Sequence, residues 1–202
     1  MNNSRKSFGF DLDNTLIDYT GAVEEYCKIK TLIPCSNIEM LREQLGKNSS
    51  SDHNWQLAQG WLYTKGLRFA QPGLGSIDLC KYLVQEGYQL FIVSHKTSHT
   101  PDFCGNTPLH DLANNWIKNS SIADYFKETE QIYYEPTREL KVKRIRELAL
   151  NYFVDDLEEV FNETGFPINT KSFLIYKSSS RNSKIKCVSD FSEIKGILAN
   201  GF

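Results

Sequence analysis

The sequence has little net charge. Its 202 residues include 23 lysines and arginines against 25 aspartates and glutamates, so the formal net charge is −2. A chain without an excess of positive charge does not attract nucleic acid or an anionic membrane through its overall field. We therefore expect neither partner, and local cations or a metal ion would have to hold any anionic ligand.

The sequence also lacks paired cysteines and long apolar runs. Its five cysteines are widely spaced and include no CxxC pair, which is typical of reduced thiols in the cytoplasm. The apolar stretch after Ser7 is interrupted at Asp11, so we predict no secretory signal and no transmembrane segment. These absences predict a cytoplasmic protein, whereas the oligomeric state is not determined by the sequence.

What the sequence does contain is a series of apolar runs that alternate with helical patterns. The runs are rich in aromatic and β-branched residues and predict buried strands at residues 8–12, 88–94, 131–134, 151–155 and 172–176. Apolar residues at helical spacing lie between them, most clearly at 76–86 and 140–150. This alternation predicts an α/β fold with a Rossmann-like open parallel sheet. The serine-rich, basic stretch at 177–186 is predicted to be a solvated loop.

One long segment departs from the alternation. The region after the first predicted strand contains no clear further strand and indicates two or three helices, with breaks near Pro34 and at residues 46–51. We therefore predict a small α-helical cap at residues 18–72. It would be inserted into a core domain made of residues 1–17 and 73–202.

Two carboxylates follow the first predicted strand. Asp11 and Asp13 are two residues apart in the string FDLDNT. On an extended backbone such residues point the same way, so we expect both carboxylates to aim at one point beyond the strand's carboxyl end, where open α/β sheets bind ligands. Adjacent carboxylates repel each other unless a cation or a proton lies between them. A divalent cation is the natural answer, so the pair predicts a site for Mg²⁺, which prefers oxygen ligands.

Three further groups stand at predicted strand ends or helix starts. Ser94 closes the second strand, Lys141 lies at the start of a helix, and Asp155 and Asp156 stand at the end of the strand at residues 151–155. An acid pair, a hydroxyl, a lysine and a second acid pair, in this order, resemble the motifs of the haloacid dehalogenase superfamily. The resemblance extends over essentially the whole chain.

The resemblance implies a role for each acid of the first pair. Asp11 matches the nucleophile that forms an aspartyl-phosphate. Asp13 matches the acid that protonates the leaving group and then activates water, and its backbone carbonyl would also bind Mg²⁺. The dehalogenase branch lacks an acid at this position because a halide needs no proton, so Asp13 indicates a phosphate ester as the substrate.

The remaining motifs imply the phosphate and metal ligands. Ser94 and Lys141 match the hydroxyl and the amine that hold phosphate oxygens. Asp155 and Asp156 match the acids that complete the metal site, and the resemblance does not decide which of them contacts the ion. Paired acids before a helix also serve as N-caps, so one of the two is expected to do that instead.

Neighbouring residues add weaker candidates. Backbone N–H groups around Asn14 would form an anion-binding turn, and His95 follows Ser94 directly and would face the substrate together with Lys96. Lys143 is the alternative to Lys141, since both lie on one predicted helix, whose N-cap would be Thr137.

Together these features predict a magnesium-dependent phosphomonoester phosphatase that acts on a small soluble phosphate ester. A small cap leaves an open site, suited to modest-sized organophosphates, and one of His53, Trp55 or Gln56 would close over the substrate. The string SHKT at residues 94–97 with this cap resembles a branch found among bacterial surface-polysaccharide genes, which implies a sugar phosphate or a phosphorylated small alcohol. A phosphomutase and a non-catalytic binding module of the same fold remain as alternatives.

Overall fold

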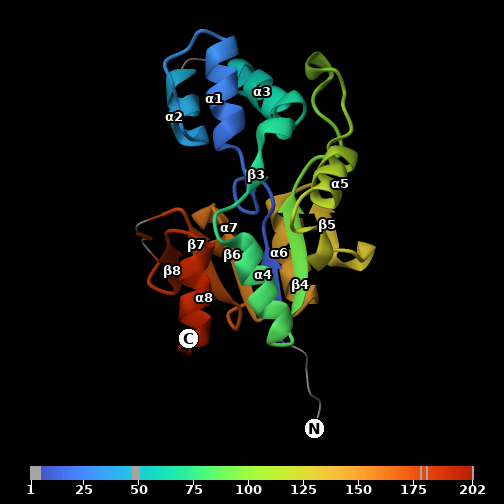
Figure 1. Cartoon of the computed structure of the whole chain (residues 1–202), viewed down its shortest axis with the longest axis vertical. Helices are drawn as coiled ribbons and strands as arrows, with labels where there is room; N and C mark the ends of the chain where they lie inside the picture. Colours follow the sequence, from blue (N-terminus) through green and yellow to red (C-terminus); the bar gives the residue numbers. More distant parts are fainter. Residues whose placement is uncertain (1–5, 47–50, 178, 181, 202) are drawn as a thin grey trace.

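A computed structural model describes residues 6–46, 51–177, 179–180 and 182–201. Within these residues, six strands form a parallel sheet in the order β5-β4-β1-β6-β7-β8 (Figure 1). The strands are β1 (Ser7–Phe10), β4 (Gln89–His95), β5 (Ile132–Glu135), β6 (Tyr152–Asp155), β7 (Lys171–Ile175) and β8 (Ile185–Val188). The predicted α/β class with a parallel, Rossmann-like sheet is confirmed.

The edge strand β8 was not predicted. It begins at Ile185, so the expectation of a loop through residue 186 is wrong at its end. Only four residues pair with β7, and a lysine stands among them, which hides the strand from a search for apolar runs. Ile185 and Val188 are nevertheless buried, because their side chains cover the sheet next to β7.

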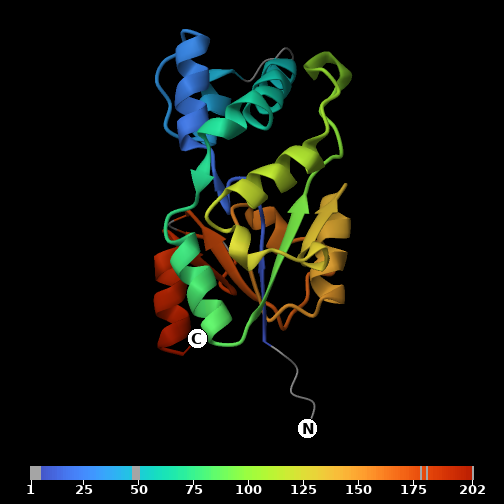
Figure 2. The same cartoon turned by 45° about the vertical axis from the view of Figure 1, so that its right-hand side comes forward.

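Helices cover both faces of the sheet, as two views show (Figures 1 and 2). On one face, Phe8 and Phe10 of β1 share a core with α4 (Ser76–Gln85) and α8 (Phe191–Ala199). On the other face, Phe91 and Phe153 pack with residues of α6 (Arg138–Glu147) and α7 (Glu158–Phe161). The alternation of side chains along each strand therefore builds two cores, and the sheet is buried on both sides.

The central strand depends on one glycine. A Cβ atom on Gly9 would lie 2.4 Å from Leu150 Cδ1 and 2.7 Å from Phe153 Cδ2. These distances are too short for carbon atoms, so a side chain at this position would push the second core apart. Gly9 thus lets Leu150 and Phe153 cover β1 directly.

A group of helices lies above the carboxyl ends of the strands (Figures 1 and 2). It consists of α1 (Thr20–Ile29), α2 (Ile38–Gln44), α3 (Ser51–Leu62) and the 3₁₀ helix η1 (Lys65–Phe69). A short antiparallel pair, β2 (Ile17–Asp18) with β3 (Gln71–Pro72), joins the group to the sheet domain. Residues 47–50 of the break predicted at residues 46–51 lie outside the described residues.

A loop from the sheet domain reaches up to these helices (Figure 2). It connects β4 to α5 (Leu109–Asn119) and carries the 3₁₀ helix η2 (Asp102–Cys104). The rings of Phe103 and His53 are 4.7 Å apart, and the Cys104 thiol lies 3.6 Å from the Gln56 carbonyl. The loop therefore packs against α3. The 3₁₀ helices η3 (Ala123–Tyr125) and η4 (Thr129–Gln131) precede β5.

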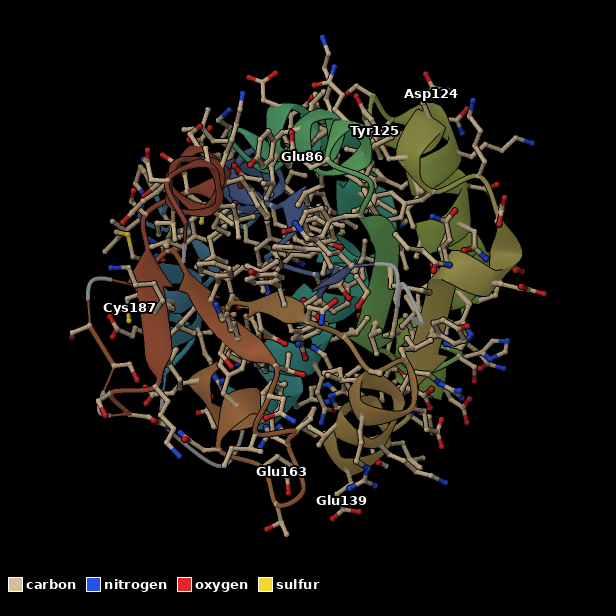
Figure 3. The ribbon with its side chains drawn as sticks, turned by 90° about the horizontal axis from the view of Figure 1, so that it is seen from below. Glu86, Asp124, Tyr125, Glu139, Glu163 and Cys187 are labelled. Carbon is tan, nitrogen blue, oxygen red and sulfur yellow. The ribbon has the colours of Figure 1, made fainter. Side chains whose placement is uncertain are left out.

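Two exposed acidic side chains lie on different elements of the sheet domain, Asp124 on η3 and Glu139 on α6. Seen from below, Asp124 and Glu139 lie at the periphery of the view (Figure 3). No helix among the described residues has the length and apolar character needed to cross a membrane. The cysteines are free thiols, and Cys27, Cys35 and Cys80 are buried.

Candidate functional site

Three carboxylates meet at the carboxyl ends of two neighbouring strands. Asp11 directly follows β1, Asp155 is the last residue of β6, and Asp156 comes next. One carboxylate oxygen from each lies within 4.8 Å of the others. The pairing of β1 with β6 brings them together, and the Asp11 N–H continues that pairing by donating to the Val154 carbonyl at 2.9 Å. The predicted convergence of the two acid motifs is thus present in the structure.

Lys141 lies inside this group. Its Nζ is 2.5 Å from Asp11 Oδ1 and 2.6 Å from Asp155 Oδ2, and its side chain is 2% exposed. Helix α6 delivers it from its first turn, after the predicted N-cap Thr137 accepts a hydrogen bond from the Leu140 N–H. Lys143, the alternative, is exposed and pairs with Glu147. The structure therefore brings Lys141, and not Lys143, to the acids.

Burial and mutual repulsion dominate the electrostatics. Burial raises the pKa of Asp11 from 3.8 to about 7; Lys141 lowers it, whereas Asp155 raises it further. Burial, Asp155 and Asp11 raise the pKa of Asp156 well above its usual value. Burial alone would lower the pKa of Lys141, but the carboxylates of Asp11 and Asp155 outweigh it and the pKa is raised. When ionised, the three carboxylates thus carry more negative charge than the single ammonium group of Lys141 offsets.

This donor set fits a divalent cation. Three ionised carboxylates and one ammonium leave two negative charges, which a single divalent ion would neutralise. Carboxylate oxygens are the ligands that Mg²⁺ prefers, and a cation among them removes the repulsion that raises the pKa values of Asp11 and Asp156. Asp155 also accepts a hydrogen bond from the Leu157 N–H at 3.0 Å, which fixes its carboxylate.

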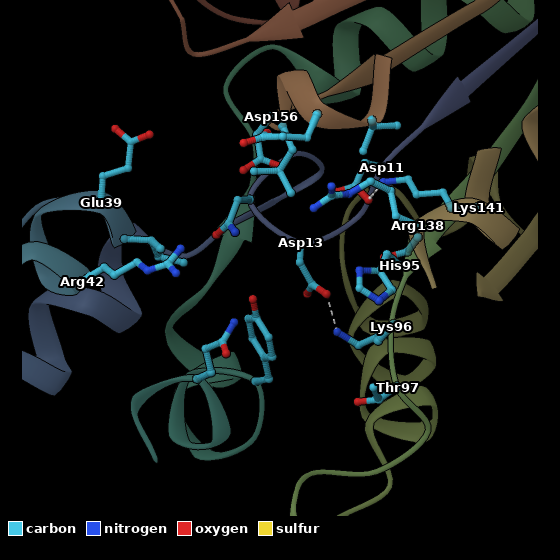
Figure 4. A pocket seen from close by; sticks show the side chains of 18 of the residues that line it. Asp11, Asp13, Glu39, Arg42, His95, Lys96, Thr97, Arg138, Lys141 and Asp156 are labelled. Carbon is cyan, nitrogen blue, oxygen red and sulfur yellow. Dashed lines mark hydrogen bonds and ion pairs between the residues drawn. The ribbon is translucent and has the colours of Figure 1, made fainter. Parts of the chain in front are cut away.

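Asp13 has different partners. Its Oδ2 lies 2.5 Å from Lys96 Nζ (Figure 4), and its Oδ1 accepts a hydrogen bond from the Tyr19 hydroxyl at 2.7 Å. Both carboxylates nevertheless line one cavity, Asp11 beside Lys141 and Asp13 beside Lys96, and their shared aim at one ligand stays a prediction. Because β1 ends at Phe10, the alternation of an extended strand does not determine the direction of Asp13. A contact of its backbone carbonyl with Mg²⁺ stays a prediction.

The other predicted residues lie around the same cavity, which has a volume of about 770 Å³. Ser94 is buried near the end of β4, and Asn14 has a left-handed φ of 61° in the turn after Asp13. The Thr15 N–H donates to the Leu12 carbonyl, so it is not available to the predicted anion-binding turn. His95 lines the cavity, and its Nε2 donates to the Pro136 carbonyl at 3.2 Å.

The helices above the sheet form the roof of this cavity. Arg42 of α2 lies over the ring of Trp55 of α3, with 5.5 Å from the guanidinium to the ring centre. Trp55 and Gln56, two of the residues expected to close over a substrate, line the cavity. His53, the third, packs against Phe103 instead.

Two residues of the site differ from the predictions, since Arg138 was not predicted and Lys96 was expected to face the substrate beside His95. Arg138, one turn before Lys141, lines the cavity, and Lys96 is buried against Asp13. The sequence holds a signal for Lys96, because residues two apart on a strand share a face and Ser94 precedes it by two. No comparable pattern marks Arg138 on a helix rich in basic residues.

The comparisons with known proteins divide sharply between sequence and structure. No protein-family model matches the chain, and no curated protein matches it. Among solved structures, SP0104 from Streptococcus pneumoniae, a haloacid dehalogenase-like hydrolase, has a TM-score of 0.61 at 17% identity, covering 96% of this chain and 98% of that one. A hydrolase of the same family from Deinococcus radiodurans, with bound phosphate and sodium, has a TM-score of 0.60 at 10% identity, covering 97% and 96%.

Protein Tyrosine Kinase A from Mycobacterium tuberculosis is also similar, with a TM-score of 0.63 at 14% identity over 99% of this chain and 100% of that one. At these identities the comparisons establish the fold, which is that of haloacid dehalogenase superfamily hydrolases. The predicted resemblance is confirmed at that level. The chemistry must be argued from the site, since one fold hosts many activities.

Proposed function

We propose that the protein is a magnesium-dependent phosphatase of the haloacid dehalogenase type, which hydrolyses a small phosphomonoester through an aspartyl-phosphate on Asp11. The observation that carries the proposal is the buried lysine bridge: Lys141 joins Asp11 to Asp155, with Asp156 beside them, at the carboxyl ends of β1 and β6. A purely structural acid cluster has no need of three repelling carboxylates in one buried place.

In the first step, a carboxylate oxygen of Asp11 attacks the phosphorus atom and the ester P–O bond breaks. The departing alkoxide takes a proton from Asp13. Lys141 holds Asp11 in place and offsets the negative charge that gathers as the phosphoryl group approaches, while Ser94 lies at the adjacent strand end to contact a phosphoryl oxygen.

In the second step, Asp13 accepts a proton from a water molecule, which attacks the phosphorus atom. The bond between phosphorus and Asp11 breaks and inorganic phosphate leaves. Splitting one hydrolysis into two displacements is the general advantage of a carboxylate nucleophile. Mg²⁺, held by Asp11, the Asp13 carbonyl and Asp155 or Asp156, would supply charge neutralisation for the phosphoryl oxygens.

The substrate is proposed to be small. A cavity of about 770 Å³ under a roof of helices accommodates a modest organophosphate. Residues 18–72 are proposed to act as a cap that excludes water and selects the leaving group, on a core of residues 1–17 and 73–202. Sugar phosphates and phosphorylated small alcohols suit these dimensions. The free cysteines are compatible with the proposed cytoplasmic location.

The test is turnover of p-nitrophenyl phosphate by the wild type with Mg²⁺, by the wild type with EDTA, and by the Asp11→Asn variant with Mg²⁺. The expected result is turnover in the first case alone. Asp124→Asn is a matched control, because this aspartate is exposed and pairs with Lys127, three residues further along the chain. Robust turnover by Asp11→Asn, with deamidation excluded by mass spectrometry, would contradict the proposal.

A further inference from the structure

Lys96 is a buried lysine that serves the second aspartate of the acid pair. Its side chain is 5% exposed, and its Nζ lies 2.5 Å from Asp13 Oδ2 (Figure 4). The Tyr19 hydroxyl donates to the other carboxylate oxygen of Asp13 at 2.7 Å. Both oxygens of this carboxylate are therefore held, one by a charge-assisted bond.

The backbone of Lys96 is fixed on the sheet side. Its N–H donates to the Glu135 carbonyl at 2.9 Å, which extends the pairing of β4 with β5 by one residue. Its carbonyl accepts a hydrogen bond from His110 Nε2 at 3.1 Å, and the His110 ring stacks on Tyr134 at 4.5 Å. The lysine is thus presented from a rigid strand end.

The helices above the sheet complete the arrangement. The Lys96 ammonium lies 4.7 Å from the ring centre of Tyr63, which follows α3, and the rings of Tyr63 and Tyr19 are 5.3 Å apart. A lysine from the sheet domain and a tyrosine from the cap therefore meet on one carboxylate. Asp13 stands at the junction of the two units, beside the cavity.

Lys96 differs from Lys141 in its partners, because the single carboxylate of Asp13 balances its charge. Lys141 lies among three carboxylates, whereas Lys96 faces Asp13 and an aromatic ring. A carboxyl group has about four lone-pair sites, so two donors leave sites for the proton that Asp13 gives to the leaving oxygen and later accepts from a water. The contacts set the direction of those sites.

We propose that Lys96, assisted by Tyr19, is a positioning residue that holds the carboxyl group of Asp13 on the leaving-group side of Asp11. The inference rests on the proposed function, since it concerns proton transfer by Asp13 to the departing alcohol. It assigns Lys96 to the acid, and not to the phosphoryl group of the substrate.

The two roles are separated by the leaving group. An alkyl phosphate needs a proton on its leaving oxygen, whereas p-nitrophenolate leaves without one. The ratio kcat/KM includes every step up to the departure of the alcohol, so comparing it for 2-phosphoglycerol and p-nitrophenyl phosphate isolates the proton transfer. Inhibition by inorganic phosphate reports how well the phosphoryl group itself is held.

In Lys96→Met we expect kcat/KM for 2-phosphoglycerol to fall about tenfold or more beyond its fall for p-nitrophenyl phosphate. The inhibition constant of inorganic phosphate should change by less than about twofold, because the phosphoryl ligands are untouched. Tyr19→Phe should shift the ratio in the same direction, and Lys96→Arg should recover part of it. Lys118→Met, an exposed lysine in the last turn of α5, is the matched control.

An equal loss for both esters, or a large weakening of phosphate inhibition, would overturn the inference. Crystal structures of the wild type and Lys96→Met provide a readout that needs no activity. The Asp13 carboxylate should leave Tyr19 and take another rotamer in the variant; an unchanged Asp13 would also overturn the inference. A wild type inactive on both esters would contradict the proposed function, and these crystal structures would still decide the role of Lys96.

Discussion

Replacing Asp11 by asparagine should stabilise the metal-free protein, and increasingly so as the pH rises. The amide has the shape of the carboxylate but no charge to bury, and Lys141 keeps its bond to Asp155. The pKa of Asp11 is raised from 3.8 to about 7, mainly by burial, so the folded state binds this proton more tightly than the unfolded chain does. The free energy of unfolding therefore falls with rising pH between those two values and is level above the second.

The size of the effect follows from that interval. The full separation of the two pKa values corresponds to about 4 kcal/mol, since one pH unit is worth about 1.4 kcal/mol. Between pH 5 and pH 8, Asp11 accounts for about 3 kcal/mol of it. In EDTA, the stability of Asp11→Asn relative to the wild type should grow by that amount over this range.

Urea unfolding followed by tryptophan fluorescence at pH 5, 6, 7 and 8 measures the difference, and the three tryptophans make the signal accessible. Asp124→Asn, whose side chain is 82% exposed, should show no pH-dependent difference from the wild type. If the difference in unfolding free energy between Asp11→Asn and the wild type is constant with pH, or narrows as the pH rises, the description of Asp11 as a buried and crowded carboxylate is wrong.

Three further results are expected. Lys141→Met should abolish turnover and lower the free energy of unfolding by about 3 kcal/mol, because two buried carboxylates lose their partner. The free energy of unfolding of Lys143→Met should stay within about 0.5 kcal/mol of the wild type, and equal effects of the two substitutions would refute the choice of Lys141 over Lys143. Mg²⁺ at about a hundred times its dissociation constant should stabilise the wild type by about 3 kcal/mol in thermal or urea unfolding. Asp156→Asn should lose most of this gain, and an equal gain in the variant would show that Asp156 is not a ligand of the ion. Gly9→Ala should cost about 1–3 kcal/mol, since its Cβ would meet Leu150 at 2.4 Å, and an unchanged urea midpoint would contradict the close packing over β1.

The sequence predicts those parts of the molecule that depend on local pattern. Buried parallel strands are continuous apolar runs, so β1, β4 and β6 were located, and with them the chain positions of Asp11 and Asp155. The N-cap at Thr137 followed from the same kind of local rule, and it sets the turn of α6 that carries Lys141. Parallel strands then bring their carboxyl ends to one edge, which is why distant acids could be expected to meet.

The parts that depend on tertiary contacts were not predictable. The direction of Asp13 is decided by Lys96 and Tyr19, which come from distant elements, and by where β1 stops. The strand β8 is short and carries a lysine, so its burial is visible only once β7 is in place beside it. Which residues roof the cavity, such as Arg42, depends on how the helices of residues 20–69 sit over the sheet.

The role of Asp11 as the nucleophile is tested most directly by trapping the phosphoryl group on the enzyme. The wild type is mixed with Mg²⁺ and a phosphate ester that it hydrolyses, quenched in acid within the first turnover, digested and examined by mass spectrometry. The expected result is one added phosphoryl group on Asp11, absent from Asp11→Asn. A phosphoryl group found on another residue, such as Ser94 or His95, during metal-dependent turnover would contradict it.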